Sequence, residues 1–368
     1  MSCIGSLRRA ALLALAAGAL GACTGEDDDP PCPEDAGTLC RVIGTGTLGF
    51  NGEGLPAEES WLYFPSAVRV HPDGRLVVVD FNNMRVRALD PDGTLVTIAG
   101  NGEHAWSTPG AQVRETALEN PIDAVYAPDG TLYILPLHEA RVVRVGADGI
   151  ANPCAGTGDI GYDGDGGDAT LATLSEASGL AVGDDGALYV ADTQNNAIRV
   201  VEDGVIRTLA GAAEAGFVDG VGAEARFSGP QRIAVGEGTL YVADANNHAI
   251  RAVDLTTGAV TTVAGTGARG YAGDGGAANA ALLMYPYGVN VGSDSALWIA
   301  DSGNNVVRRV RDGLIETVAG TGVEGFTGDD GPAVDATFAF PVHMVEHDGS
   351  LYVADMKNGA VRAVRGVE

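Results

Sequence analysis

The chain contains glycines that recur at nearly constant spacing, each directly after a short strand-like stretch. Successive members of this set are 56, 56, 55, 54 and 55 residues apart. They are Gly44, Gly100, Gly156, Gly211, Gly265 and Gly320. A period this regular indicates that one supersecondary unit is stacked repeatedly. A residue present in every copy is therefore expected to serve the unit rather than a unique site.

Each unit is predicted to contain four short strands. In the copy between Gly265 and Gly320 the apolar stretches cover residues 289–291, 297–301 and 306–308, and a fourth leads into Gly320. Gly, Asp and Asn residues separate them, as in hairpin-connected antiparallel strands. No stretch has the length and 3.6-residue period of a regular helix. The fold class is therefore all-β.

The second strand of each unit is the most apolar, as in residues 76–79, 240–243 and 351–354. Continuous apolarity, in place of alternation, implies burial on both faces. Copies of a four-stranded antiparallel sheet that pack face to face provide this environment when they close into a ring. The sequence therefore predicts a β-propeller.

The number of blades follows from an aspartate that ends the second strand. It occurs in five copies, with Pro136 in the remaining place, and this gives six blades. The aspartates are Asp80, Asp192, Asp244, Asp301 and Asp355. The last copy ends before a fourth strand, whereas residues 39–43 form a fourth-type strand without a blade of their own. We predict that this N-terminal strand completes the last blade, so that the propeller spans residues 39–368.

The recurring motifs resemble those of the NHL-repeat family of propellers. They include Ala-Gly-Thr-Gly, Gly-Asp-Gly-Gly, Leu-Tyr-Val-Ala-Asp and Asn-Asn-x-Ile-Arg. The resemblance covers residues 39–368 and implies the fold much more specifically than a function. Members of this family include protein-binding scaffolds, sensor domains, RNA-binding domains and at least one lyase.

Residues 1–22 are predicted to be a signal peptide. Arg8 and Arg9 precede an Ala/Leu-rich run that is too short to span a bilayer, and Leu-Gly-Ala stands directly before Cys23. This arrangement resembles a bacterial lipoprotein signal, in which Cys23 carries the lipid. The alternative is an ordinary signal peptide with a coincidental cysteine. The lipoprotein prediction gives an exported protein anchored in the cell envelope, facing the periplasm or the cell surface.

Residues 23–38 are acidic, proline-rich and poor in apolar side chains, which predicts a disordered tether. Export implies an oxidising compartment, so Cys32 and Cys40 are candidates for a disulfide that fixes the tether to the closing strand. Both cysteines staying free is the alternative.

The charge of the chain limits its partners. The formal net charge is −27, and removal of residues 1–22 with two arginines and no acid leaves −27 − 2 = −29. Such a charge argues against nucleic acid or an anionic membrane surface as a ligand. Membrane contact is expected only through the lipid at Cys23, and mutual repulsion favours a monomer.

Two acidic patterns suggest chemistry but are interpreted as scaffold. In five blades an arginine follows the strand-ending aspartate by seven residues, as in Asp301 and Arg308. Blade 2 has Pro136 and Val143 instead, so we predict it to be the least regular. A glycine-rich loop is the second pattern, and its most acidic copy offers a calcium site at Asp163, Asp165 and Asp168. Other copies hold fewer acids, so a structural loop is preferred and no cofactor is expected.

The best candidate site is where the repeat fails at the start of the first strands. Two residues after the opening proline, three blades carry small residues and three carry Asp123, Arg232 and His343. These three would surround the channel mouth. The flanking candidates are Gln231, Tyr285 and Tyr287, and further aromatics on the same loops are Trp61, Tyr63, Phe64 and Phe340. The alternative is that the three polar groups satisfy one another or trapped water.

Two functions are therefore considered. The first is a non-catalytic scaffold that binds a protein, peptide or glycan partner through exposed loops. The second is a lyase- or lactonase-like propeller enzyme with a metal in the central channel. Zinc catalysis uses about three protein ligands, and His343 is the one histidine near the start of a first strand. We therefore assign no catalytic residue and favour the scaffold.

Overall fold

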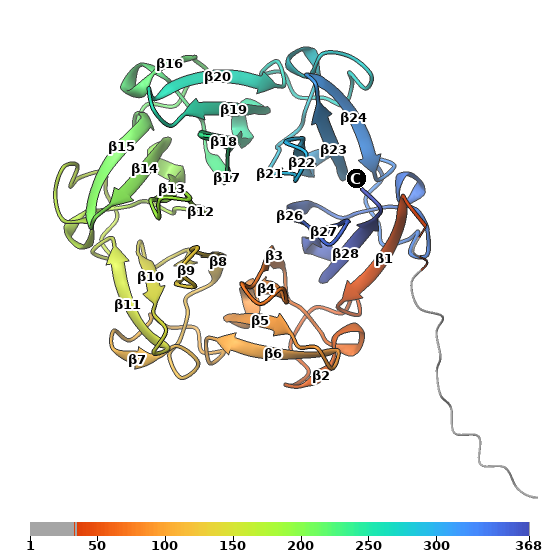
Figure 1. Ribbon diagram of the computed structural model, residues 1–368, viewed down its shortest axis with the longest axis horizontal. Helices are drawn as coiled ribbons and strands as arrows, with labels where there is room; N and C mark the ends of the chain where they lie inside the picture. The colour runs from red at the N-terminus through yellow and green to blue at the C-terminus, as the bar shows by residue number, and fades with distance from the viewer. Residues whose placement is uncertain (1–32, 34, 368) are drawn as a thin grey trace, which may run out of the picture. The chain divides into compact units, whose positions relative to one another are not determined.

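A computed structural model describes residues 33 and 35–367 of the 368-residue chain. The predicted signal peptide, Cys23 and Cys32 lie outside the described residues. The described part is all-β and forms six antiparallel sheets around a central axis (Figure 1). The prediction of a six-bladed β-propeller is confirmed. Among these residues no helix has the length and apolarity needed to cross a bilayer.

Each blade has four main strands, from the channel outwards. The innermost strands are β3 (Pro65–Val70), β8 (Pro121–Tyr126), β12 (Gly179–Val182), β17 (Pro230–Gly236), β21 (Gly288–Val291) and β26 (Pro341–His347). The second strands are β4 (Leu76–Asp80), β9 (Leu132–Pro136), β13 (Leu188–Asp192), β18 (Thr239–Asp244), β22 (Leu297–Asp301) and β27 (Ser350–Asp355).

The outer strands follow in the same order. The third strands are β5 (Arg85–Leu89), β10 (Val142–Val145), β14 (Ala197–Glu202), β19 (Ala249–Asp254), β23 (Val306–Arg311) and β28 (Ala360–Arg365). The fourth strands are β6 (Thr94–Ala99), β11 (Ile150–Ala155), β15 (Val205–Gly211), β20 (Ala259–Ala264), β24 (Leu314–Ala319) and β1 (Thr38–Ile43).

Four blades also carry a two-residue strand outside the fourth one, which the sequence pattern did not predict. These short strands are β2 (Leu55–Pro56), β7 (Ala111–Gln112), β16 (Gly220–Val221) and β25 (Gly331–Pro332). Each lies in the loop that enters the blade and pairs with the fourth strand of a blade, for example β2 with β6. They cover part of an otherwise open sheet edge.

The ring is closed by the N-terminal strand, as predicted. β1 pairs antiparallel with β28, with Leu39 opposite Val364 and Ile43 opposite Val361. Leu39 and Ile43 are fully buried, and burial of such side chains contributes about 1.5–3 kcal/mol each. Cys40 on the same strand is disulfide-bonded. Its predicted partner, Cys32, lies outside the described residues.

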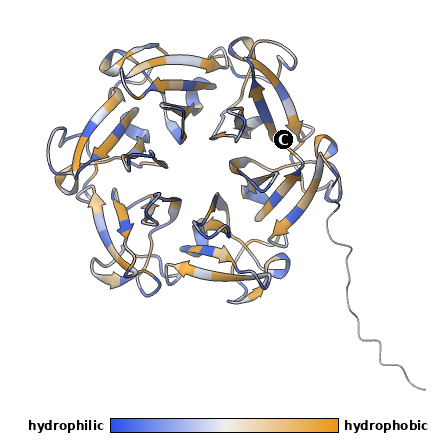
Figure 2. Ribbon diagram, viewed as in Figure 1, coloured by the Kyte–Doolittle hydropathy of each residue, from blue (hydrophilic) through white to orange (hydrophobic). Residues whose placement is uncertain are grey.

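The hydrophobic core lies between neighbouring blades. All five residues of β4 are buried, and Val77 and Val79 pack in one cluster with Leu132 and Ile134 of the next blade. Apolar residues concentrate on the strands, whereas the connecting loops are mostly hydrophilic (Figure 2). The continuous apolarity of the second strands is thus explained by burial on both faces.

Short 3-10 turns occur at two points of five blades. One set precedes the first strand: η1 (Ala57–Glu59), η3 (Ala169–Leu171), η5 (Gly222–Glu224), η7 (Ala278–Ala280) and η9 (Ala333–Asp335). The other follows the second strand: η2 (Phe81–Asn83), η4 (Thr193–Asn195), η6 (Ala245–Asn247), η8 (Ser302–Asn304) and η10 (Met356–Asn358). Blade 2 has neither turn within the described residues, which agrees with its predicted irregularity.

Candidate functional site

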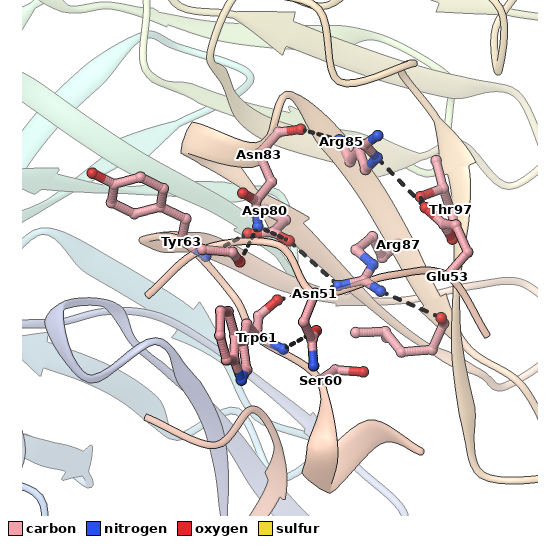
Figure 3. A network of polar contacts seen from close by, with 12 residues as sticks. Asn51, Glu53, Ser60, Trp61, Tyr63, Asp80, Asn83, Arg85, Arg87 and Thr97 are labelled. Carbon is pink, nitrogen blue, oxygen red and sulfur yellow. Dashed lines mark hydrogen bonds and ion pairs between the residues drawn. The ribbon is translucent and has the colours of Figure 1, made fainter. Parts of the chain in front are cut away.

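The repeated aspartate and arginine form a buried network inside each blade. In blade 1 the Asp80 carboxylate accepts the backbone N–H of Tyr63 at 2.7 Å and the side-chain N–H of Asn83 at 2.8 Å (Figure 3). Asn83 also donates to the Gly49 carbonyl at 2.6 Å. Arg87 is fully buried, 3.6 Å from Asp80. The network connects the incoming loop, the second strand and the third strand.

The same contacts recur in four other blades, in agreement with the predicted structural role. Each strand-ending aspartate accepts a backbone N–H from a residue at the end of the loop that enters its blade; these residues are Ser175, Ser228, Met284 and Ala339. Burial raises the pKa of Asp301 and Asp355 to about 7. The asparagine amide, the backbone N–H and the arginine oppose this rise, because each stabilises the carboxylate.

The three acids of the calcium hypothesis have separate roles. Asp165 forms an ion pair with Arg199 at 2.7 Å. Asp168 accepts the Thr170 backbone N–H at 2.9 Å and its hydroxyl at 2.7 Å, which caps the η3 turn. The Asp163 side chain is exposed, and its backbone N–H donates to Thr173. Their contacts are therefore those of a loop that packs against its own blade.

In blade 2 a glutamate takes the place of the strand-ending aspartate as the hydrogen-bond acceptor for the incoming loop. Glu139 is fully buried and accepts the backbone N–H and the hydroxyl of Ser107 at 2.8 and 2.6 Å. It also accepts the Glu119 N–H at 3.4 Å, the position that aspartate serves in the other blades. Burial raises the pKa of Glu139, and its three hydrogen bonds oppose the shift.

The structure brings Asp123, Arg232 and His343 together in the channel, but they are buried there rather than open at its mouth. They are 0, 3 and 1% exposed. Arg232 donates from Nη2 to the carbonyls of Ser66 and Ile122, both at 2.8 Å, and from Nη1 to that of Ser178. One side chain of blade 4 therefore forms hydrogen bonds to blades 1, 2 and 3.

Arg69 is a fourth channel residue, which the sequence reasoning missed. Its Nη2 contacts both carboxylate oxygens of Asp123, at 2.9 and 2.8 Å, and also the Leu180 carbonyl at 3.1 Å. Asp123 additionally accepts the Leu180 N–H at 2.9 Å. Arg69 lies four residues after the opening Pro65 rather than two. A search of every second residue along the first strands would have found it, because side chains of one face recur with period 2.

His343 lies in surroundings that disfavour the imidazolium form. Burial lowers its pKa well below the ordinary range, and the neighbouring cations Arg69 and Arg232 lower it further. The Val68 carbonyl offsets part of this shift, although neither ring nitrogen has a partner within hydrogen-bonding geometry. Burial also lowers the pKa of Arg232, and the charge of Asp123 opposes this change.

Aromatic side chains lie on the face of the ring where the first strands begin, next to the buried channel residues. One residue before each first-strand proline, or its equivalent, has a left-handed backbone conformation. The six are Phe64, Asn120, Glu176, Gly229, Tyr285 and Phe340, with φ of 58, 47, 42, 60, 46 and 58°. The aromatic members come from blades 5, 6 and 1, which are consecutive around the ring. With their neighbours they form a group that we call the mouth aromatics: Tyr63, Phe64, Tyr285, Tyr287 and Phe340.

Four of the mouth aromatics form two ring pairs, and the group remains partly accessible. The rings of Tyr63 and Phe64 lie 5.1 Å apart, and those of Tyr287 and Phe340 lie 5.0 Å apart. Tyr63 and Tyr285 are 36 and 38% exposed. Tyr285 packs edge-on against His248, with centroids 4.7 Å apart. Gln231 is half-buried beside Arg232.

Comparison with known proteins supports the NHL type of repeat that the motifs predict. The Teneurin NHL domain model matches residues 53–219, and the NHL repeat model matches residues 227–252. NHL repeat-containing protein 2 of Bos taurus is 32% identical over 203 residues, which are 48% of this chain and 28% of that protein. The chain thus spans only part of the length of the curated relatives it matches, 24 and 28% in two cases.

Solved structures show the same fold at low sequence identity. An auxiliary nutrient binding protein from Bacteroides thetaiotaomicron aligns with a TM-score of 0.65 and 14% identity, over 88% of this chain and 75% of that one. Virginiamycin B lyase from Staphylococcus aureus aligns with a TM-score of 0.51 and 14% identity, over 89 and 98% of the two chains. The likeness to these structures concerns the fold, a six-bladed β-propeller, and the two family models show that its repeats are similar to those of the NHL type.

Proposed function

We propose that this protein is a non-catalytic binding scaffold, which holds a protein, peptide or glycan partner against the mouth aromatics. The observation that carries the proposal is the backbone conformation under three of these side chains. Bulky L-residues are rare at positive φ, and the left-handed conformation costs them about 1–2 kcal/mol. At the equivalent place in blade 4 the chain uses Gly229, which adopts this conformation without that cost.

The chain therefore keeps Phe64, Tyr285 and Phe340 where glycine fits the backbone better. Backbone strain at a defined position is a reason to look for a function there. Aromatic rings stack on sugar rings and on apolar peptide side chains, and they lose little conformational entropy when they bind. Their rigid placement by the blade network favours recognition by shape on this face.

The channel itself supports binding at the face rather than passage through the ring. Arg232 bonds to three backbone carbonyls across the channel, and Asp123 is occupied by Arg69. Asp123, Arg232 and His343 are then the floor of the site, and they fix the spacing of the blades that carry the aromatics. The net charge of −27 favours neutral or basic partners over polyanions.

The alternative, a propeller enzyme with a metal in the channel, has weaker support. The likeness to a lyase at 14% identity concerns the fold. His343 is buried beside two arginines that lower its basicity, and this environment disfavours a cation. The structural similarity to an auxiliary nutrient binding protein favours the scaffold, and this similarity too is one of fold at 14% identity.

We also propose a location for the protein, which is export and anchoring in the cell envelope through a lipid at Cys23. A lipid at Cys23 and an acidic tether that leads from Cys23 to β1 would display the propeller outside the cytoplasm. Replacement Cys23→Ser is expected to abolish labelling by radioactive palmitate and to release the protein from membranes. Labelling that persists in this variant would contradict the lipid anchor without affecting the binding proposal.

The binding proposal is tested with glycan and peptide arrays probed with the full chain and with Tyr285→Gly. We expect the variant to lose at least tenfold in affinity for any ligand found, while its melting temperature stays equal or rises because strain is relieved. Trp106→Ala is the control, since Trp106 is an exposed aromatic, 47% accessible, that contacts Arg141 on blade 2. Equal loss in both variants, or none in Tyr285→Gly, would contradict a site at the mouth.

A further inference from the structure

His343 is buried in the channel with its hydrogen-bonding capacity unused. The residue is 1% exposed, and among the described residues neither ring nitrogen has a hydrogen-bond partner. The other polar side chains of the channel reach across blades: Arg69 pairs with Asp123 at 2.8 Å, and Arg232 donates to three carbonyls. Buried polar groups are nearly always hydrogen-bonded, so an unpartnered imidazole indicates a bound water molecule or ion.

The charged side chains of the channel do not balance. Arg69 and Arg232 are cations, whereas Asp123 is their one nearby anion among the groups that shift the pKa of Arg232, which burial lowers first of all. The Asp123 carboxylate is already occupied by Arg69 and by the backbone N–H groups of Leu180 and Ala124, both at 2.9 Å. Arg232 bonds to neutral carbonyls instead. A buried cation without a counter-charge is costly, so this group favours an anion.

The unpartnered imidazole and the two cations lie in the same part of the channel. β26, which carries His343, packs against β3, which carries Arg69. Arg232 reaches β3 as well, where its Nη2 donates to the Ser66 carbonyl at 2.8 Å. After burial, the groups that lower the pKa of His343 are Arg69 and Arg232. Nitrogen donors from blades 1, 4 and 6 therefore gather beside the first strand of blade 1.

We propose that the channel binds one monatomic anion of the chloride class between His343, Arg69 and Arg232. The imidazole N–H and guanidinium N–H groups donate to the ion, and its charge balances the excess arginine. A water molecule would satisfy the imidazole but would leave the charge unbalanced. The near-complete burial of His343 and Arg232 favours a small ion over an oxyanion. The side chain of Arg69 is 12% exposed and gives the ion a route from solvent.

The ion would connect the closing blade to the rest of the ring. Cross-channel hydrogen bonds of Arg69 and Arg232 already join blades 1, 2, 3 and 4. His343 belongs to blade 6, the blade that β1 completes. An ion shared by the three side chains adds this blade to the network. The inference goes beyond the proposed function, because the ion lies in the channel rather than against the mouth aromatics.

Thermal melts of the full chain in about 100 mM chloride or gluconate test the proposal, because an ion that binds only the folded chain raises the melting temperature. We expect chloride and bromide to stabilise the wild type relative to gluconate at equal ionic strength. His343→Leu should lose this rise. His347→Leu is the control, because His347 pairs with Asp348 in a separate loop at 3.3 Å, and it should respond to halide as the wild type does.

Crystals of the wild type grown with bromide locate the ion by its anomalous scattering, whether or not His343→Leu folds. We expect a peak within hydrogen-bonding distance of His343 and of at least one of Arg69 and Arg232. Bromide peaks on the outer surface alone, or an equal halide effect in His343→Leu and the wild type, would overturn the proposal.

The ion proposal and the scaffold proposal can fail separately. Tyr285→Gly leaves the channel side chains in place, so it should keep the halide response of the wild type even where it loses its partner. An anion beside His343 would also raise the pKa of the imidazole, so pH comparisons that involve this residue belong in halide-free buffer.

Discussion

The Nη2 atom of Arg232 on β17 donates to the carbonyl oxygen of Ser66 on β3 at 2.8 Å, across the channel and 166 residues away in the chain. The same guanidinium bonds to blades 2 and 3. Arg232, a ligand-site candidate in the sequence, therefore links four blades in the structure. Its contacts are those of a stabilising residue, and they leave the face of the ring as the proposed place for binding.

Replacement Arg232→Ala is expected to destabilise the propeller by at least about 3 kcal/mol, since three buried carbonyls lose a charged donor. Gln231→Ala, at the half-buried neighbouring position, should change the free energy of unfolding by less than about 1 kcal/mol. Denaturant melts of both variants measure the difference. Similar values for the two would show that the cross-channel bonds carry little stability.

Arg308 and Arg309 offer a matched test of the repeated network. Arg308 is fully buried and donates to the carbonyls of Leu282 and Ala272 at 3.1 and 3.3 Å. Arg308→Ala should cost about 3–5 kcal/mol, because it leaves buried Asp301 without its cation. Arg309 pairs with exposed Glu316, so Arg309→Ala should cost less than about 1 kcal/mol. Equal free energies of unfolding for Arg308→Ala and Arg309→Ala in denaturant melts would contradict a structural role for the network.

Deletion of residues 39–43 should lower the melting temperature sharply. It removes the partner of β28 and exposes the apolar surface that Leu39 and Ile43 cover. The milder double variant Leu39→Ala, Ile43→Ala should cost about 4–10 kcal/mol in total if the two effects add. Arg41→Ala, at a half-buried position of the same strand, is the control. An unchanged melt after the deletion would contradict closure of the ring by this strand.

His343 predicts a specific pH dependence of stability. Its pKa is lowered in the folded protein, so below pH 6.5 the unfolded chain takes up a proton that the folded chain does not. Stability is then lost as the pH falls, by about 1.4 kcal/mol per pH unit until the folded pKa is reached. In His343→Leu this loss disappears, so between pH 7.5 and pH 5.5 the variant should gain stability relative to the wild type, by up to about 1.4 kcal/mol.

The buried aspartates act in the opposite direction, because their raised pKa adds stability as the pH falls. They are present in both proteins and cancel in the comparison, which denaturant melts at the two pH values provide. Parallel pH dependence of wild type and His343→Leu would show that the pKa of His343 is the same in the folded and the unfolded chain.

Much of this fold follows from the sequence because the repeat is strict. The glycine period gives the blades, and the missing fourth strand near Val361 identifies Leu39 to Ile43 as its replacement. The sequence does not show whether a candidate residue is buried inside the channel or exposed at its mouth. That position depends on the way in which long side chains such as Arg232 and Arg69 reach from one blade to another. Those contacts join segments more than 50 residues apart, and no local pattern encodes them.

The left-handed aromatics were also beyond the sequence pattern. Phe64, Tyr285 and Phe340 precede prolines, and residues in that position favour extended backbone. The preceding residue is held on both sides in the folded blade: the Tyr63 N–H donates to Asp80, and the Tyr63 carbonyl accepts the Asn82 N–H at 3.0 Å. Tertiary bonds therefore impose a conformation that local preference disfavours.

The central claim, that the mouth aromatics receive the partner, is tested most directly by site-specific photocrosslinking in intact cells. A benzoylphenylalanine is placed at position 285, or at position 271 as the control, since Tyr271 is 44% exposed in a loop of the same blade that packs on Arg308. The account predicts one defined adduct from position 285, lost on addition of Phe340→Ala, and none from position 271. An adduct from position 271 alone, or one from position 285 that survives Phe340→Ala, would contradict it.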